Sequence, residues 1–294
     1  MLFHNAKELL ALCEEKNCKI SQIALEQDLE DMEISEAELL EKVGIILDTM
    51  LSSAEEATTK EVRSISKMSG GYAKLAMDYA KEGDPICGKD LMRAMAYAFS
   101  TSEVNASMGR IVAAPTAGSS GILPAVIRTL HEKEGLDREA LKRILFTASA
   151  IGQIVEVNAT VSGAEGGCQA ECGTAAAMGA AAVVEALGGT PKQSTEAASF
   201  AFMNIMGLVC DPIGGFVEFP CSLRNASGIM NALSCADLAM AGIESLVPFD
   251  EVVDAMARVG RALPESLRET GKGGVAITST GLALKKEYLD HELE

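Results

Sequence analysis

The sequence predicts an all-α fold, a single helical domain with glycine-rich loops as its candidate active-site segments. Of its 294 residues, 48% are hydrophobic, which is enough for a substantial core. Aromatic residues make up only 4% and tryptophan is absent, whereas glycine occurs 27 times and methionine 14 times. Small side chains at the contacts allow helices to approach closely, so we expect a core of closely packed helices.

The spacing of apolar residues supports helices along most of the chain, because these residues recur at intervals of three and four. The stretch 6–51 fits two or three acidic amphipathic helices, and its carboxylate-rich run 26–38 is expected to be a solvated face or turn. A short strand is an alternative at 109–114, and a short charged helix is expected after the flexible glycine-rich stretch 271–274. The other predicted helices are 90–100, 122–133, 138–151, 172–187, 194–209, 226–241 and 249–262.

The organisation of the chain favours one domain over residues 1–294, because no repeat of fixed period and no low-complexity linker divides it. Residues 1–60 are a candidate for a semi-independent N-terminal helical segment. The run Gly-Gly-Thr-Pro at 188–191 is typical of a helix end, since glycine adopts the left-handed cap and proline cannot continue the helix.

The net charge of −17 excludes the basic face that nucleic acids and anionic membranes require. The longest apolar stretch, 175–184, is shorter than the roughly 20 residues that cross a bilayer. No N-terminal stretch has the make-up of a signal peptide. We therefore expect a cytoplasmic protein that binds neither nucleic acid nor membrane. Its eight cysteines should stay reduced there, so metal ligation is a better hypothesis for them than disulfides.

A loop of small residues, APTAGSSGILPA at 114–125, leads into a predicted helix. Hydroxyl groups and free backbone amides at a helix N-terminus can bind a carboxylate or a phosphate. The alternative is an ordinary helix cap by Ser119 or Ser120. The loop lacks both the GKS and the GxGxxG motifs of nucleotide-binding loops, so both interpretations stay open.

Three cysteines stand in glycine- or proline-marked frames, Cys168 in GGCQ, Cys210 in CDPIGG and Cys221 in PCSLRN. They lack the CxxC pairs typical of structural zinc, so a trio gathered by the fold favours an iron–sulfur cluster with one iron left free. Cys168 taken alone would more often be a small buried hydrophobic residue. Arg224 could neutralise cluster charge, bind a carboxylate through both nitrogens, or form a surface salt bridge.

Other titratable residues carry weaker signals. Cys172 lies four residues after Cys168 and could share its helix face, but it lacks the same glycine setting. Lys272 is expected to face solvent or bind an anion rather than form a Schiff base. The histidines stand in charged, surface-like settings that argue against a histidine base in this chain, and they are His4, His131 and His291. The cysteines expected to be structural are Cys13, Cys18, Cys87 and Cys235.

Five segments together resemble the α chain of the iron–sulfur-dependent L-serine dehydratases, bacterial lyases that work without pyridoxal phosphate. The segments span almost the whole chain and are APTAGSSGILPA at 114–125, SGAEGGCQAECG at 162–173, GLVCDPIGG at 207–215, FPCSLRNA at 219–226 and LRETGKGGVAITSTG at 267–281. The resemblance implies a four-iron, four-sulfur (4Fe-4S) cluster bound by Cys168, Cys210 and Cys221.

The activity that this resemblance implies is dehydration of L-serine, in which the free iron binds the substrate hydroxyl and a base removes the Cα proton. Loss of water gives aminoacrylate and then pyruvate and ammonia, a reaction of amino-acid degradation and gluconeogenesis. The residues implied to bind substrate are Thr116, Gly118, Ser119, Ser120 and Arg224.

The resemblance also implies a partner, because the family occurs either as one fused chain or as α and β chains. This sequence begins directly with α-type sequence, so we expect a β chain, a hetero-oligomer, and a contribution of acid–base residues from the partner; the catalytic base is left unassigned. Some fused relatives end in a cysteine that caps the free iron. No cysteine follows Cys235 here, so what occupies the fourth iron at rest is left open.

Two alternatives compete with the lyase. The first is a non-catalytic iron–sulfur electron-transfer or sensor subunit, which needs a fourth strong ligand such as Cys172 or Cys235. The second is a helical subunit whose cysteines are all inert.

Overall fold

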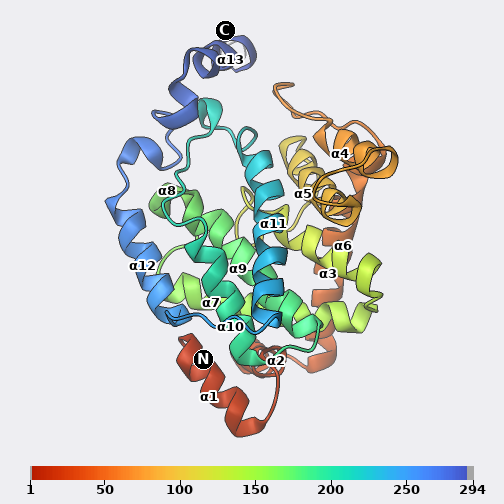
Figure 1. Ribbon diagram of the computed structural model, residues 1–294, viewed down its shortest axis with the longest axis vertical. Helices are drawn as coiled ribbons and strands as arrows, with labels where there is room; N and C mark the ends of the chain where they lie inside the picture. The colour runs from red at the N-terminus through yellow and green to blue at the C-terminus, as the bar shows by residue number, and fades with distance from the viewer. Residues whose placement is uncertain (1, 290–294) are drawn as a thin grey trace.

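The computed structural model describes residues 2–289 and is all-α over them, as the sequence predicts (Figure 1). The longer helices are α1 (Ala6–Lys16), α2 (Ile20–Met32), α3 (Glu36–Thr59), α4 (Tyr72–Glu82), α5 (Lys89–Ala106), α6 (Ile122–Glu134), α7 (Arg138–Asn158), α9 (Cys168–Ala186), α10 (Pro191–Met203), α11 (Cys221–Met240), α12 (Phe249–Ala262) and α13 (Ser279–Tyr288). The short helical turns are α8 (Gly163–Gly166), η1 (Ile213–Gly215), η2 (Glu265–Leu267) and η3 (Gly274–Ile277).

Extended pairing is minimal in the described part of the chain. It consists of two isolated bridges, Arg63 with Gly70 and Cys210 with Arg268. The strand considered at 109–114 does not form. Within residues 2–289, no helix combines the length and apolar character needed to span a membrane.

Helix α9 runs through the centre of the domain and packs against α7, α10, α11 and α6 (Figure 1). Every residue from Cys168 to Glu185 is buried. A Cβ atom added at Gly173 would lie 3.0 Å from Phe202 Cε1, and one at Gly179 would lie 2.9 Å from Val126 Cγ2. The small side chains of α9 therefore allow several helices to surround it, the close packing that the composition predicts.

Several predicted helix boundaries are wrong, and the three missed helix starts share a cause. Helices α9, α10 and α11 begin three to five residues earlier than predicted, because glycine and proline before them were interpreted only as loop signals. At α10, Thr190 caps the helix and forms a capping box with Gln193, so Pro191 occupies the first helical turn, where proline is favoured. Helix α10 also ends at Met203 rather than at 209, while α5 and α7 continue to Ala106 and Asn158.

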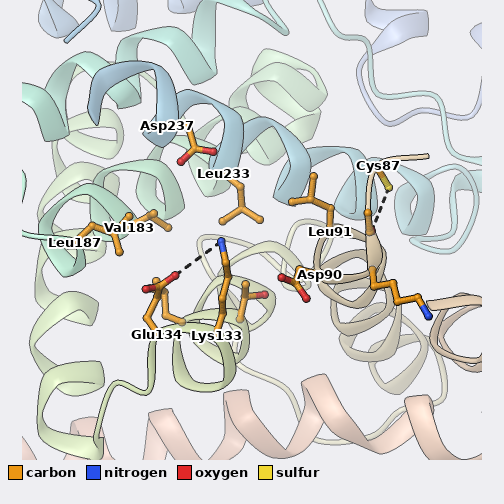
Figure 2. A pocket seen from close by; sticks show the side chains of 13 residues that line it. Cys87, Asp90, Leu91, Lys133, Glu134, Val183, Leu187, Leu233 and Asp237 are labelled. Atoms are coloured by element: carbon orange, nitrogen blue, oxygen red, sulfur yellow. Dashed lines mark hydrogen bonds and ion pairs between the residues drawn. The ribbon is translucent and has the colours of Figure 1, made fainter. Parts of the chain in front are cut away.

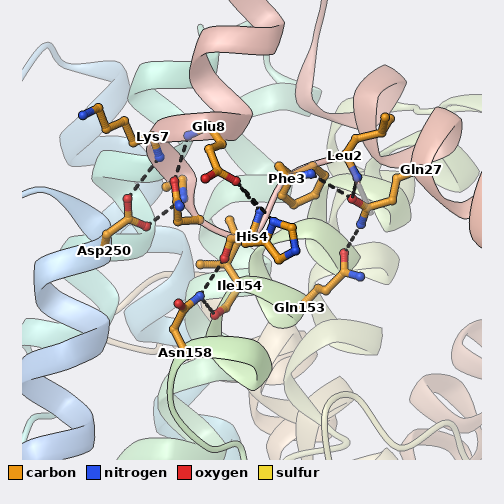
Figure 3. Close-up of polar contacts among 12 residues, drawn as sticks. Leu2, Phe3, His4, Lys7, Glu8, Gln27, Gln153, Ile154, Asn158 and Asp250 are labelled. Atoms are coloured by element: carbon orange, nitrogen blue, oxygen red, sulfur yellow. Dashed lines mark hydrogen bonds and ion pairs between the residues drawn. The ribbon is translucent and has the colours of Figure 1, made fainter.

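The N-terminal segment is tied to distant parts of the chain by polar contacts (Figure 3). The backbone N–H groups of Leu2 and Phe3 donate to Gln27 Oε1 over 2.9 and 3.2 Å. Asp250, in the first turn of α12, accepts hydrogen bonds from the first turn of α1, including one of 2.7 Å from the Ala6 N–H. Asn158 Nδ2 donates to the His4 carbonyl over 2.7 Å. Helix α1 is therefore capped by its own Asn5, which accepts from the Glu8 N–H, and also by Asp250 from a helix near the other end of the chain.

Helix α4 is capped by a buried carboxyl group from α5. Its own cap residue, Gly71, has no side chain, and Glu103 Oε1 instead accepts hydrogen bonds from the N–H groups of Tyr72 at 2.5 Å and Ala73 at 3.2 Å. Glu103 is only 3% exposed, and its Oε2 atom has no hydrogen-bond partner among the described residues. Burial raises the pKa of Glu103 from 4.5 to about 7, against the opposing effect of the two N–H donors.

This buried carboxyl group predicts a pH-dependent contribution to stability. The folded state keeps the Glu103 proton up to about pH 7, whereas the unfolded chain releases it near its ordinary pKa of 4.5. The contribution of Glu103 to the unfolding free energy of wild type is therefore fully present below pH 4.5 and is lost progressively as the pH rises to 7. Glu103→Gln keeps the acceptor oxygen and cannot ionise. Between about pH 5 and 8 its unfolding free energy should therefore rise by roughly 1–3 kcal/mol relative to that of wild type.

Urea denaturation at a series of pH values measures this difference. The exposed Glu41→Gln exchange on α3 is the matched control and should track wild type throughout. Parallel stability curves for Glu103→Gln and wild type would contradict the prediction.

Candidate metal centre

Cys168 is presented at the buried start of α9. It is 1% exposed, and the preceding Gly167 has a φ of 76°, which favours glycine. A Cβ atom at Gly167 would lie 2.9 Å from the Leu208 carbonyl oxygen, which accepts a hydrogen bond of 3.0 Å from the Gln169 N–H. Glycine before the cysteine therefore allows the segment that leads to Cys210 to lie against the start of the helix.

Cys210 is held by the C-terminal part of the chain. Its N–H donates to the Leu267 carbonyl over 2.9 Å, and its carbonyl accepts a hydrogen bond of 2.7 Å from the Glu269 N–H. The next residue, Asp211, accepts a hydrogen bond of 2.6 Å from the Val275 N–H. The glycine-rich stretch 271–274, predicted only as a flexible connection, is thus fastened on both sides to residues 210 and 211.

The fold brings Cys168 and Cys210 together from different segments. Their Sγ atoms and a carboxylate oxygen of Glu171 all lie within 4.8 Å of one another, and all three residues are buried. Cys172 Sγ lies 3.4 Å from Cys168 Sγ, one helical turn further along α9. This buried set of sulfur and oxygen atoms could bind a metal ion.

Cys221 approaches the same region without joining that closest group. It is the first residue of α11 and is 4% exposed. Burial and then the negative charges of Cys168 and Glu171 raise the pKa of its thiol, which places it within electrostatic reach of both. Cys235, further along α11, lies apart and contacts Asn204 and Asn231.

The electrostatics single out one thiolate in the group. Hydrogen bonds from Cys172 and Cys210 lower the pKa of Cys168 well below its ordinary value, with help from Arg224 and against the effect of burial. The same hydrogen bonds raise the pKa values of the two donors, Cys172 and Cys210. Burial and then the Cys168 charge raise the pKa of Glu171 to about 7. Binding a cation would displace the remaining protons, because thiolates and carboxylates are the ligating forms.

The loop before α6 contacts this group through Glu171. The Thr116 hydroxyl donates to Glu171 Oε1 and lies 3.2 Å from Ser119 Oγ. Ser120 Oγ donates to the Ala117 carbonyl over 2.8 Å, and both serines are fully buried. Neither serine side chain caps α6, which follows Gly121 without a side-chain cap, so the capping alternative is wrong.

Gly118 lies directly against the carboxylate. A Cβ atom there would be 2.5 Å from Glu171 Oε1 and 2.9 Å from Oε2. Asn225, in the first turns of α11, holds the loop by accepting from the Gly121 N–H over 2.8 Å and donating to the Gly118 carbonyl over 2.7 Å. The loop, Glu171 and the start of α11 therefore form one connected polar unit.

Arg224 forms a buried ion pair rather than a surface salt bridge. Its Nη2 atom donates to Asp211 Oδ1 over 2.5 Å, and the two side chains are 15% and 4% exposed. Its Nη1 atom is buried and has no hydrogen-bond partner among the described residues. A cavity of about 410 Å³ is lined by residues that include Arg224, Cys172 and Leu208.

The residues that the sequence analysis argued against as site residues lie away from this site wherever the structure describes them. His4 and His131 are exposed, and His291 lies outside the described residues. Lys272 faces solvent and forms a 3.9 Å ion pair with Glu265. Another cavity of about 420 Å³, between α5, α6, α9 and α11, is lined by residues such as Lys133 and by none of the predicted site residues (Figure 2).

Three residues at the site lie outside the set predicted to form it. Helical spacing indicated that Cys172 shares the face of Cys168, but only the electron-transfer alternative used it, and the same spacing could have found Glu171 had α9 been predicted to begin at Cys168. The third, Glu269, has its carboxylate 3.5 Å from the position of a Cβ at Gly163, beside Cys210 Sγ and Glu171. No local signal in the sequence indicates that contact.

Comparison with known proteins identifies the family. The sequence model described as "Serine dehydratase alpha chain" matches residues 15–276. The chain is 50% identical over 288 residues to the L-serine dehydratase alpha chain of Peptoniphilus asaccharolyticus, covering 98% of this chain and 99% of that one. It is 44% identical to a probable L-serine dehydratase alpha chain of Bacillus subtilis, covering 97% and 95%. This chain therefore belongs to the serine dehydratase alpha chain family.

A longer relative shows a different arrangement. The L-serine dehydratase of Streptomyces coelicolor is 36% identical over 285 residues, which is 94% of this chain but only 61% of that protein. The longer protein therefore contains a substantial part that has no counterpart in this chain.

The contact between Gly118 and Glu171 predicts the effect of one added methyl group. The φ of Gly118 is within the range of ordinary residues, so Gly118→Ala would act through its collision with the carboxylate. We expect a loss of roughly 1–3 kcal/mol of unfolding free energy, as for other overpacked sites. Gly44→Ala on α3 is the control, because its Cβ would meet only flexible arginine and lysine side chains. Chemical denaturation of both variants and of wild type tests this prediction. An unfolding free energy of Gly118→Ala equal to that of wild type would refute it.

Proposed function

We propose that this chain is the α subunit of a 4Fe-4S L-serine dehydratase that acts with a β chain in the cytoplasm. Membership of the family and its 50% identity to a relative named for this activity support the reaction and the substrate. The observation that carries the proposal is the buried convergence of Cys168 and Cys210, from segments far apart in sequence, within electrostatic reach of Cys221.

The cluster ligands in this proposal are Cys168, Cys210 and Cys221. These three cysteines fit an iron–sulfur cluster, since such clusters are held by thiolate ligands and the lowered pKa of Cys168 already favours its thiolate. Cys168 and Cys221 begin α9 and α11, and the partial positive charge of a helix N-terminus stabilises a thiolate there. When bound, the cluster would supply a Lewis-acidic iron for the hydroxyl group that leaves serine.

The chain's own polar groups would bind and orient serine. Arg224 is held by Asp211 at one nitrogen and keeps a buried N–H at the other, which suits a substrate carboxylate. Thr116 lies on the loop beside Glu171, with Ser119 next to it. Closure of this buried site would keep water away while the Cα proton and the C3 hydroxyl are lost and aminoacrylate forms.

The group that removes the Cα proton is expected from the β chain. His4 and His131 are exposed, and no histidine of the described residues lines the cavity beside Arg224. The longer Streptomyces relative, of which this chain covers 61%, is consistent with a second part that a separate chain would provide here. The assembly would then be a hetero-oligomer whose site is complete only with both chains.

Cys172 lies close to Cys168 and is therefore a candidate for the fourth thiolate ligand that the electron-transfer alternative requires. Four thiolates around one cluster would leave no iron free for a substrate. The hydrogen bond to Cys168 and then burial raise the pKa values of Cys172 and Cys210 alike, so the proposal leaves Cys172 out of the ligand set on the family resemblance alone, which implies Cys168, Cys210 and Cys221.

Serine substitutions of single cysteines test these assignments. After anaerobic reconstitution with iron and sulfide, Cys168→Ser, Cys210→Ser and Cys221→Ser should each lose the intact cluster. In the presence of the β chain, serine deamination should fall by at least roughly 100-fold, because these ligands act as one unit. Cys172→Ser is the matched control and should retain the cluster and most of the activity. Iron content, Mössbauer spectra and pyruvate formation provide the measurements.

Two outcomes would contradict the proposal. A Cys221→Ser protein with a full cluster and normal turnover would remove that ligand. Loss of the cluster in Cys172→Ser, with reversible redox chemistry and no pyruvate from wild type, would instead favour the electron-transfer subunit.

A further inference from the structure

Exposed apolar side chains border the segment that leads to Cys221. Ile65 is 59% exposed, Met108 is 80% exposed and Phe216 is 51% exposed. These three residues, here called the rim, come from the loop before α4, the loop after α5 and the loop before α11. Large apolar side chains gathered at such exposure on a folded surface are typical of an interaction site.

Hydrogen bonds hold the three loops of the rim together. The Ile65 N–H donates to the Ala106 carbonyl over 3.0 Å, which places it beside the end of α5. Glu218 Oε2 accepts hydrogen bonds from Ser66 at 2.8 Å and Ser69 at 3.0 Å, which joins the first loop to the one that contains Phe216. Glu218 precedes Cys221 by three residues, at the end of α11 opposite α1 (Figure 1). The rim is therefore continuous with the candidate metal centre.

The conformation and the charges of the rim loops also point to a partner. Met108 and Lys67 have φ values of 63° and 64°, a left-handed conformation that non-glycine residues seldom adopt. The side chains of Lys67 and Arg110 are exposed and have no ion-pair partner among the described residues. In a chain with a net charge of −17, two unpaired cations beside apolar side chains fit an acidic surface that also offers apolar contacts.

We propose that the rim binds the second chain of the enzyme, through apolar contacts bordered by Lys67 and Arg110. This inference rests on the proposed function, which requires another chain to complete the site. The Streptomyces relative carries in one polypeptide a part that this chain lacks, and this chain covers 61% of it. A partner seated on the rim would lie directly over the loops that surround Cys221, where it could contribute side chains to the reaction.

Charge substitutions at the rim test the proposal with little risk of unfolding. Met108→Asp suits its left-handed backbone, which aspartate tolerates, and Phe216→Asp changes a half-exposed residue. The controls are Ile86→Asp and Leu246→Asp, which are at least as exposed and lie on other loops. Each reconstituted variant is titrated by isothermal calorimetry with the β chain encoded by the same genome.

We expect Kd to rise roughly tenfold or more for each rim variant, as for anchor residues of an interface, and to stay unchanged for the controls. Arg110→Glu should weaken binding as well, and added salt should weaken wild type more than this variant. Melting temperatures and iron contents of all variants should match wild type, which separates a lost interface from a damaged fold.

Other results would overturn the proposal. Wild-type affinity in the rim variants, or equal losses in rim and control variants, would exclude the rim as the docking site. A homodimer that dissociates in the rim variants would assign the surface to a second copy of this chain. Binding at the rim without serine turnover by the wild-type pair would refute the proposed function alone. Serine turnover by the wild-type pair together with wild-type affinity in the rim variants would refute the docking proposal alone.

Discussion

The burial of helix α9 from Cys168 to Glu185 is the constraint on which the rest of the structure depends. Alanine and glycine side chains let α7, α10, α11 and α6 pack around it, and this packing places the first residue of α9 inside the protein. A thiol at that position is cut off from water, so its charge must be balanced by neighbouring protein groups. The groups that do so are Cys172 on α9, Cys210 in the loop before η1 and Arg224 on α11.

Electrostatic coupling among these groups explains why the centre suits a cation. One thiolate, at Cys168, is stabilised by thiol donors and by Arg224, while the pKa values of Glu171, Cys210 and Cys221 are raised. Adding a multiply charged metal group would reverse those upward shifts, because a cation favours every deprotonated ligand at once. Burial therefore disfavours charge on most of these groups, and a bound cation would stabilise their deprotonated forms.

The sequence predicted the helices well where apolar spacing was regular and poorly where helices begin at the site. Spacing of three and four located α6 and α12 almost to the residue. The starts of α9 and α11 were missed because Gly167 and Pro220 resemble loop residues, although they allow a helix to begin at a cysteine. Glu269 could not be predicted, since its approach to Cys210 depends on tertiary contacts of the C-terminal segment. The Thr116 loop was found from its composition, but its contact with Glu171 required the fold.

The most direct test of the central claim is a crystal structure of the anaerobically purified protein with anomalous data at the iron edge. We expect anomalous density for several iron atoms bonded to the Sγ atoms of Cys168, Cys210 and Cys221, with Cys172 and Glu171 not bonded to metal. A single ion bound by Cys168, Glu171 and Cys210, the closest group in the structure, with Cys221 unbound would contradict it.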